Sequence, residues 1–249
     1  MRKNCLIITI LFLYLAPELS AQKFTYKAHM ERMDSRWDNN NNAAVARIIG
    51  EYKPEMDRLM QEVIGHSEYE MLSGRPESLL SNFAADALLD GARHISEKGT
   101  VDIALTNFGG LRAAIPAGEI KRYHIFATFP FENNLVILDI SGKSVKALFE
   151  SFARRRVEAF SHTVKMVSKD GTLATLLING EPVDEDKIYR LATIDYLLDG
   201  GDSMNMLKDA IAIEHTGIVL RDVIIGHIQR ETKAGNKITS YISNRVTIE

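Results

Sequence analysis

The segment TNFGGLR combines an amide, two adjacent glycines and a guanidinium within seven positions. Asn107 and Arg112 can hydrogen-bond to a polar or anionic ligand, and Gly109 and Gly110 permit a sharp turn that leaves backbone N–H groups accessible. The mainly apolar run at residues 101–105 predicts a buried strand that leads into this turn. A Gly-Gly pair before an arginine is also typical of an ordinary turn. The mixture of side chains nevertheless favours a ligand-binding loop, and anionic ligands suit it best.

Two other segments carry a similar mixture of aromatic, amide and carboxylate side chains: residues 129–134, FPFENN, and residues 196–202, YLLDGGD. In this order, the three segments resemble the motifs Asn-x-Gly-Gly-(Ile/Leu)-Arg, Pro-Phe-x-Asn and aromatic-x-x-x-Gly-Gly-Asp of the 5′-nucleotidase and UDP-sugar hydrolase family. The resemblance is to the C-terminal, substrate-binding domain of that family, and it covers residues 43–249.

This resemblance implies a clamp for a nucleoside. In the family, the aromatic residues of the second and third motifs hold the base between them, and these positions are Phe131 and Tyr196 here. Stacking on each ring contributes about 1 to 3 kcal/mol per base, and a tyrosine keeps the ring face that stacking requires. By the same family positions, Asn107 is expected to bind the edge of the base, and Asp202, directly after Gly201, the ribose hydroxyls. Without the resemblance, Asp202 would be interpreted as a turn residue or as the N-cap of a following helix.

Two arginines are implied as phosphate ligands. Arg112 holds the position from which the family contacts the phosphate, and a planar guanidinium binds oxyanions through two parallel hydrogen bonds. Arg75 lies close to the place of a second phosphate-binding arginine, about one residue out of register. Phe108 stands where the family often has glycine, so its ring is expected beside the ligand loop, where it would narrow the site or face a partner.

The apolar periodicity predicts an α+β fold, with mixed β-sheets flanked by helices as in the 5′-nucleotidase C-terminal domain. Helical spacing occurs in residues 43–63, with a break or fresh start at Pro54, and in residues 78–94, 145–152 and 219–228. Strand-like runs occur at residues 101–105, 135–140, 163–167, 173–178 and 189–194. An Asp-Gly pair at residues 170–171 and an Asn-Gly pair at residues 179–180 predict tight turns.

The N-terminus has the layout of a secretory signal peptide, since two basic residues precede an apolar run and small residues that end at Ala21. Residues 1–21 are therefore expected to be removed and the protein to be exported, either periplasmic or secreted. The apolar run is shorter than the roughly 20 residues that span a bilayer, so permanent membrane insertion is not expected. Cys5, the only cysteine, precedes the run. Residues 22–42 are expected to form a polar linker before the domain at residues 43–249.

The formal net charge is −3, and no basic stripe runs along the sequence, so a nucleic-acid partner is not expected. The run Arg154-Arg155-Arg156 follows a helical pattern and is predicted to be a solvated helix end rather than an anion-binding or docking patch. None of the seven histidines stands in a metal-ligand motif such as Asp-x-His or His-x-His. No metal or other cofactor is therefore expected in this chain.

Three hypotheses for the function follow. In full-length members of the family, hydrolysis is carried out by an N-terminal metallophosphatase domain with a two-metal site. The leading hypothesis is that this chain is the substrate-binding part of a split exported 5′-nucleotidase, which hydrolyses nucleoside phosphates together with a separate metallophosphatase chain that holds divalent metals. The first alternative is a stand-alone nucleoside- or nucleotide-binding module without catalysis. The second is a structural domain whose ligand site has decayed, for which Phe108 is the main support.

Overall fold

The computed structural model describes residues 24–37 and 42–249, and the predicted signal peptide lies outside this part of the chain. The chain divides into two compact units, residues 1–50 and 51–249. The described residues of the first unit include the 3-10 turn η1 (Ser35–Trp37) and the start of a long helix. Within the described residues, no helix has the length and apolar character needed to cross a membrane.

The long helix α2 (Ala43–Met60) continues through Pro54, so the alternative of one helix holds over that of two short ones. The prediction that the helical pattern extends to Val63 is wrong. Val63 begins a strand, β1 (Val63–Ser67), which pairs antiparallel with β3 (Gly118–Lys121). Apolar spacing over so few residues fits a helix end and a strand equally well, and the long-range pairing with β3 decides between them.

A five-stranded mixed sheet lies at the centre of the second unit. Its strand order is β10-β4-β9-β2-β5, in which β9 and β2 are parallel and the other neighbours antiparallel. The strands are β2 (Ile103–Thr106), β4 (Asn134–Ser141), β5 (Ala159–Phe160), β9 (Ile188–Ile194) and β10 (Ala212–Val219). The three strands predicted in this region are confirmed. β10 was not predicted, because it is an edge strand with mostly exposed side chains and lacks an apolar run.

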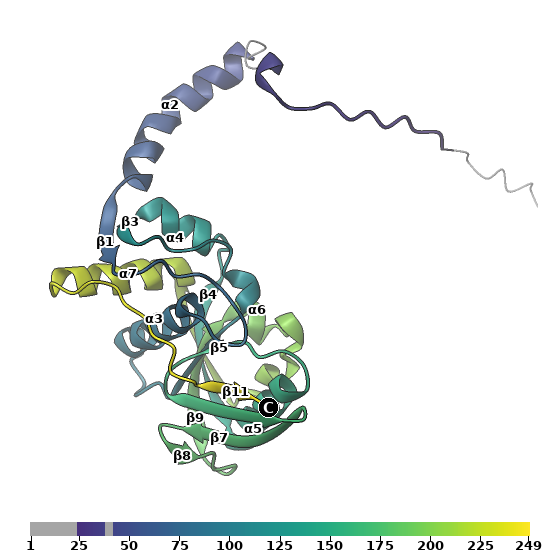
Figure 1. The fold of residues 1–249 in the computed structure, drawn as a ribbon, viewed down its shortest axis with the longest axis vertical. Helices are drawn as coiled ribbons and strands as arrows, with labels where there is room; N and C mark the ends of the chain where they lie inside the picture. The colour runs from purple at the N-terminus through teal and green to yellow at the C-terminus, as the bar shows by residue number, and fades with distance from the viewer. Residues whose placement is uncertain (1–23, 38–41) are drawn as a thin grey trace, which may run out of the picture. The chain divides into compact units, whose positions relative to one another are not determined.

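A second sheet of four strands has the order β11-β6-β7-β8. Its strands are β6 (Val164–Lys169), β7 (Thr172–Ile178), β8 (Glu181–Pro182) and β11 (Val246–Ile248). Both predicted tight turns are confirmed, since φ is positive at Asp170 and Gly171 and again at Asn179 and Gly180, as a type I′ turn requires. Figure 1 shows this sheet at one end of the second unit, with β1, β3 and α4 (Arg122–Thr128) at the opposite end.

Helices cover the central sheet and complete the predicted α+β architecture. They are α3 (Leu79–Ile95), α5 (Gly142–Arg154) and α7 (Leu220–Lys233). Ser78 caps α3, because its hydroxyl accepts a hydrogen bond from the backbone N–H of Ser81 at 3.2 Å. α3 and α7 pack closely at Gly91, where any Cβ would overlap Val223. The buried faces of these helices and both faces of β4 and β9 form one core.

Candidate functional site

The predicted ligand loop begins where β2 ends and forms a 3-10 turn, η2 (Phe108–Gly110). Asn107 is buried before this turn, and its Nδ2 donates a hydrogen bond to Oδ2 of Asp202 at 2.6 Å. The two glycines make room for the amide, because a Cβ at Gly110 would lie 2.9 Å from Oδ1 of Asn107 and a Cβ at Gly109 3.1 Å from Nδ2. The first and third motifs therefore meet through an amide–carboxylate pair.

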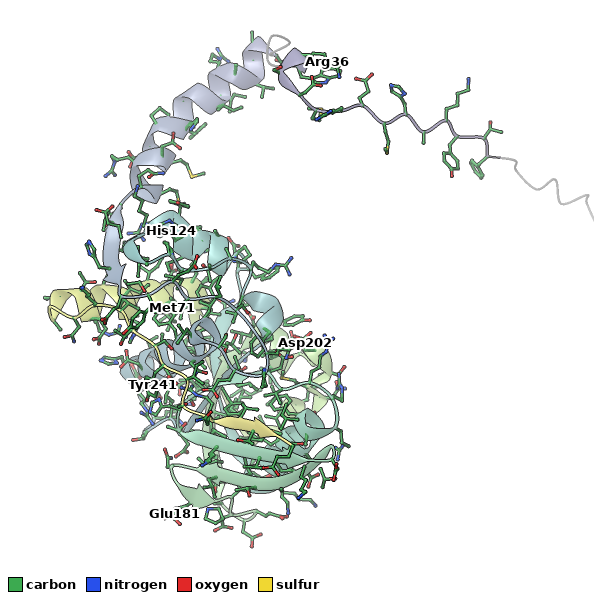
Figure 2. All side chains as sticks on the ribbon, in the orientation of Figure 1. Arg36, Met71, His124, Glu181, Asp202 and Tyr241 are labelled. Atoms are coloured by element: carbon green, nitrogen blue, oxygen red, sulfur yellow. The ribbon has the colours of Figure 1, made fainter. Side chains whose placement is uncertain are left out.

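Asp202 lies in the 3-10 turn η3 (Gly201–Ser203), in the left-handed region at φ 48°, and Ser203 follows at φ 63°. Two consecutive non-glycine residues in this region are costly and occur mainly at functional sites. The N-cap interpretation of Asp202 is wrong, since Met204 holds the N-cap position of the next turn, η4 (Asn205–Asp209). The carboxylate of Asp202 instead accepts from Asn107 and, at 3.4 Å, from the hydroxyl of Tyr196. Figure 2 shows Asp202 at the surface of the second unit.

Phe131 and Tyr196 line the same pocket, which has a volume of about 250 Å³. The other lining residues are Asn107, Gly109, Gly110, Asn133 and Asp202. Half of Phe131 and 45% of Tyr196 remain exposed, which excludes ordinary core packing for either ring. Phe129, by contrast, is 2% exposed and belongs to the core, and Phe126 is partly buried against it. The pocket thus combines two open aromatic faces with an amide and a carboxylate, which is the set of groups that a nucleoside needs.

Gly201 is required by the position of the Tyr196 ring. A Cβ at residue 201 would lie 2.5 Å from both Cε1 and Cζ of that ring, closer than real Cβ atoms approach other heavy atoms. Tyr196 belongs to the short helix α6 (Asp195–Leu198), which directly follows β9. The glycine of the third motif therefore has a packing role, in that it lets the aromatic wall fold back onto the loop that carries Asp202.

Two residues that the sequence did not single out hold the aromatic walls in place. Asp195 accepts hydrogen bonds from the backbone N–H and the Nδ2 of Asn134, both at 3.0 Å, and from the backbone N–H of Tyr196 at 2.8 Å. It therefore joins the segment after Phe131 to the segment of Tyr196. Arg221, at the start of α7, donates to the carbonyl oxygens of Phe129 and Pro130 at 3.2 and 3.4 Å. In the sequence, only its position next to Tyr196 could have identified Asp195 as a site residue. No sequence feature could have identified Arg221.

Arg75 and Phe108 form a separate cluster behind the ligand loop. The Arg75 guanidinium lies 4.3 Å from the centre of the Phe108 ring, and its Nη2 donates to Oε1 of Glu158 at 2.7 Å. Oε2 of the same carboxylate accepts from the backbone N–H of Phe108 at 2.7 Å. The expectation that Phe108 narrows the site or faces a partner is wrong, because its ring is buried beneath Arg75 and does not line the pocket of Phe131 and Tyr196.

Arg112 is exposed and does not line this pocket. Its backbone N–H donates to the carbonyl oxygen of Thr128 at 2.9 Å, which fixes the chain at the end of the loop while the side chain extends into solvent. Its role as a phosphate ligand stays a prediction. In residues 24–37 and 42–249, no three His, Cys, Asp or Glu side chains are grouped so that they could hold a metal ion.

The family model described as "5′-nucleotidase, C-terminal domain" matches residues 63–209, which include all of the predicted site residues. Protein UshA of Escherichia coli is 33% identical over 135 residues, which are 53% of this chain and 24% of that protein. The trifunctional nucleotide phosphoesterase protein YfkN of Bacillus subtilis is 26% identical over 242 residues, which are 89% of this chain and 16% of that protein. The chain thus spans about a quarter or less of these relatives.

A solved structure with a similar fold is that of the 5′-nucleotidase precursor from Thermus thermophilus. The alignment has a TM-score of 0.70 and 24% sequence identity, and it covers 82% of this chain and 43% of that one. At this identity the likeness concerns the fold, and it agrees with the mixed sheets and flanking helices described above.

Proposed function

Because this chain belongs to the 5′-nucleotidase C-terminal domain family, we propose that it binds nucleotides and is the substrate-binding part of a 5′-nucleotidase. The base lies between Phe131 and Tyr196, Asn107 binds its edge, and Asp202 binds the ribose hydroxyls. By its family position, Arg112 is the proposed phosphate ligand. No residue of this chain is assigned a catalytic role.

The pocket between the two half-exposed aromatic rings carries this proposal. Large aromatic side chains are normally buried or packed, and here two of them border a cavity of about 250 Å³ next to a hydrogen-bonded amide–carboxylate pair. The walls are held by Asp195 and Arg221 before any ligand binds. A preformed pocket lowers the ordering cost of binding, so the arrangement supports a role in ligand recognition.

Hydrolysis is proposed to be carried out by a metallophosphatase on a separate chain, which holds the divalent metals. In full-length members of the family, a metallophosphatase domain activates the attacking water. In the split enzyme, this chain would present the bound nucleotide to the separate metallophosphatase. The N-terminal sequence pattern of this chain supports its export, so the proposed partner must reach the same compartment. In this arrangement, the purified chain binds nucleotides but does not hydrolyse them.

Calorimetric titration with adenosine, AMP and UMP tests the binding proposal. Phe131→Ala and Tyr196→Ala are each expected to weaken adenosine binding about 10- to 100-fold, because one stacking contact contributes about 1 to 3 kcal/mol. Tyr69→Ala is a matched control, since Tyr69 is 48% exposed and lies outside the pocket. If neither variant weakens binding, the stacking model is wrong. If the wild-type chain binds none of the three compounds, the site is a decayed one.

Adding a candidate metallophosphatase to the chain separates the split enzyme from the stand-alone module. The expected result is that phosphate release from AMP rises when the two are combined and that Phe131→Ala reduces this gain. Unchanged rates, together with normal adenosine binding by the chain, would favour the binding module without catalysis.

A further inference from the structure

A second hollow lies directly beside the aromatic pocket. It has a volume of about 520 Å³ and shares two lining residues, Gly109 and Asp202, with that pocket. Its other lining residues are Arg75, Ser151, Phe152, Arg155, Arg156, Glu158 and Ser203. A ligand held between Phe131 and Tyr196 can therefore extend past Gly109 and Asp202 into this space without leaving the surface of the protein.

The hollow is bordered by more positive than negative side chains. Three arginines and two carboxylates border it, and the Glu158 carboxylate is paired with Arg75 at 2.7 Å. Asp202 already accepts hydrogen bonds from Asn107 and Tyr196. Arg155 and Arg156, in contrast, have no ion-pair or hydrogen-bond partner for their guanidinium groups within the described parts of the chain. Two guanidinium groups are thus available to an anion.

The segment that carries these two arginines differs from an ordinary helix end. α5 ends at Arg154, whose Nη1 lies 3.9 Å from Oε2 of Glu150 one helical turn earlier. Arg155 and Arg156 follow the helix and border the hollow instead. All three arginines are exposed at the helix end, as predicted, and Arg155 and Arg156 in addition border the hollow.

This segment is also tied to the ligand loop. Val157 accepts a hydrogen bond from Arg75 through its carbonyl oxygen, and Glu158 accepts one from the backbone N–H of Phe108. The same loop continues into Gly109, which borders both cavities. The residues that directly follow the two arginines are therefore hydrogen-bonded to Arg75 and to the ligand loop, while the arginine side chains are exposed.

We propose that this hollow is a phosphate subsite in which Arg155 and Arg156, assisted by the hydroxyls of Ser151 and Ser203, bind a phosphoryl group of the nucleotide held in the aromatic pocket. The inference rests on the proposed function. It goes beyond it by adding an anion contact distinct from Arg112 and by naming the ligand class: nucleotides that carry at least two phosphoryl groups. Guanidinium groups bind phosphate through charge-assisted, bidentate hydrogen bonds, which suits two unpaired arginines.

The test compares adenosine, AMP, ADP and adenosine 3′,5′-bisphosphate by calorimetry on the full chain. The double variant Arg155→Ala/Arg156→Ala is expected to lose about 10-fold in affinity for whichever doubly phosphorylated compound reaches the hollow, because it removes the charge-assisted hydrogen bonds to the phosphoryl group. Its affinity for adenosine is expected to be unchanged. A loss for ADP alone places the phosphoryl group on the 5′ chain, and a loss for the bisphosphate alone places it on the 3′ hydroxyl.

Two controls make the result decisive. Arg154→Ala removes an arginine of the same run that does not line the hollow and is expected to bind every compound as the wild type does. Arg155→Lys/Arg156→Lys keeps the charge and is expected to retain part of the lost affinity. If the alanine double variant binds adenosine and both doubly phosphorylated compounds like the wild type, the subsite is refuted while the aromatic pocket stands. If the wild type does not bind adenosine, the proposed function and the subsite fail together.

Discussion

The aromatic pocket and the basic hollow border the same two residues, Gly109 and Asp202, but they are built differently. The walls of the pocket come from three segments far apart in the sequence, and hydrogen bonds join these segments directly, as between Asn107 and Asp202. The hollow is bordered in part by the exposed side chains of Arg155 and Arg156, which have no partner in the described residues. One region is specified by packing, and the other by charge.

This difference determines how each region is expected to respond to change. A packed wall loses its geometry when a single atom is added or a single hydrogen bond is removed, and salt has little effect on stacking. An open cluster of positive charges tolerates changes in shape, but its attraction for anions is screened by salt. The following variants and conditions test this contrast, beginning with the largest expected effect.

Gly201→Val is expected to damage the aromatic pocket most. Its Cβ would lie 2.5 Å from two atoms of the Tyr196 ring and from the backbone carbonyl oxygen of Tyr196, so this residue must shift from its place in the pocket wall. Adenosine affinity is expected to fall about 100-fold, near the upper end of what one stacking contact contributes. Gly50→Ala is the control, since a Cβ there meets no heavy atom within 4 Å. Wild-type adenosine binding by Gly201→Val in calorimetry would show that Tyr196 is not a wall of the binding site.

Asp195→Ala is expected to loosen both walls at once. The Asp195 carboxylate accepts two hydrogen bonds from Asn134, in the segment after Phe131, and a third from the backbone N–H of Tyr196. Each hydrogen bond contributes about 0.5 to 1.5 kcal/mol, so adenosine affinity should fall about 10-fold, with a lower melting temperature. Asp195→Asn keeps one acceptor oxygen in place of two and is expected to recover part of the affinity. Asp199→Ala, at an exposed position four residues on, should change neither quantity. If Asp195→Ala and Asp199→Ala change adenosine affinity equally, Asp195 does not position the walls of the pocket.

Salt is expected to separate the two regions without any substitution. Between about 50 and about 500 mM NaCl the Debye length shortens from roughly 14 to roughly 4 Å, which weakens contacts to exposed charges. Affinity for adenosine should change less than about 2-fold, whereas affinity for the doubly phosphorylated nucleotide should fall several-fold. The additional fall should disappear in Arg155→Ala/Arg156→Ala. Equal salt dependence for both ligands would argue against an anion contact in the hollow.

Asp90→Asn is expected to give the smallest effect and to leave both regions intact. Burial acts to raise the pKa of Asp90, but hydrogen bonds from His227 and Arg230 outweigh it, so the pKa lies below its ordinary value. The ionised carboxylate therefore stabilises the packing of α3 against α7 at neutral pH by less than about 1 kcal/mol, given its partial exposure.

The pH dependence of this contribution follows from the direction of the shift. A lowered pKa in the folded state means that the stabilisation is present above the unfolded-state pKa and is lost as pH falls through the folded-state value. Denaturant unfolding of wild type and Asp90→Asn should therefore differ at pH 7 and converge in acid, with unchanged adenosine binding at neutral pH. A difference that grows in acid would contradict this assignment.

Much of the fold could be predicted because its signals are local. The Asp-Gly and Asn-Gly pairs at residues 170–171 and 179–180 form the expected tight turns, since few other residues adopt positive φ so readily. The helical pattern predicted for residues 78–94 is confirmed by α3 (Leu79–Ile95). Val63 was misassigned and β10 was missed, because each is in a strand only by virtue of a partner far away in the sequence.

In the candidate site, too, residues in local motifs could be predicted, and residues with distant partners could not. Phe131, Tyr196, Asn107 and Asp202 were identified from motifs that can be read along the chain, and the structure places all four on one pocket. Asp195, Arg221 and Glu158 were not identified, because their hydrogen-bond partners lie on other elements, from tens of residues to more than 90 residues away in the case of Arg221. Phe108 was misjudged for the same reason, since Arg75 covers its ring.

The amino-acid sequence by itself determined which chemical groups are available, where the chain can turn, and which residues must be apolar. These properties depend on single residues and their near neighbours, whose conformational preferences are intrinsic. Only the tertiary structure decided which groups face one another: two aromatic rings across a cavity, and two arginines beside it without a carboxylate partner in the described residues. Such pairings depend on distances between segments remote in sequence, and those distances are set by how the sheets and helices pack.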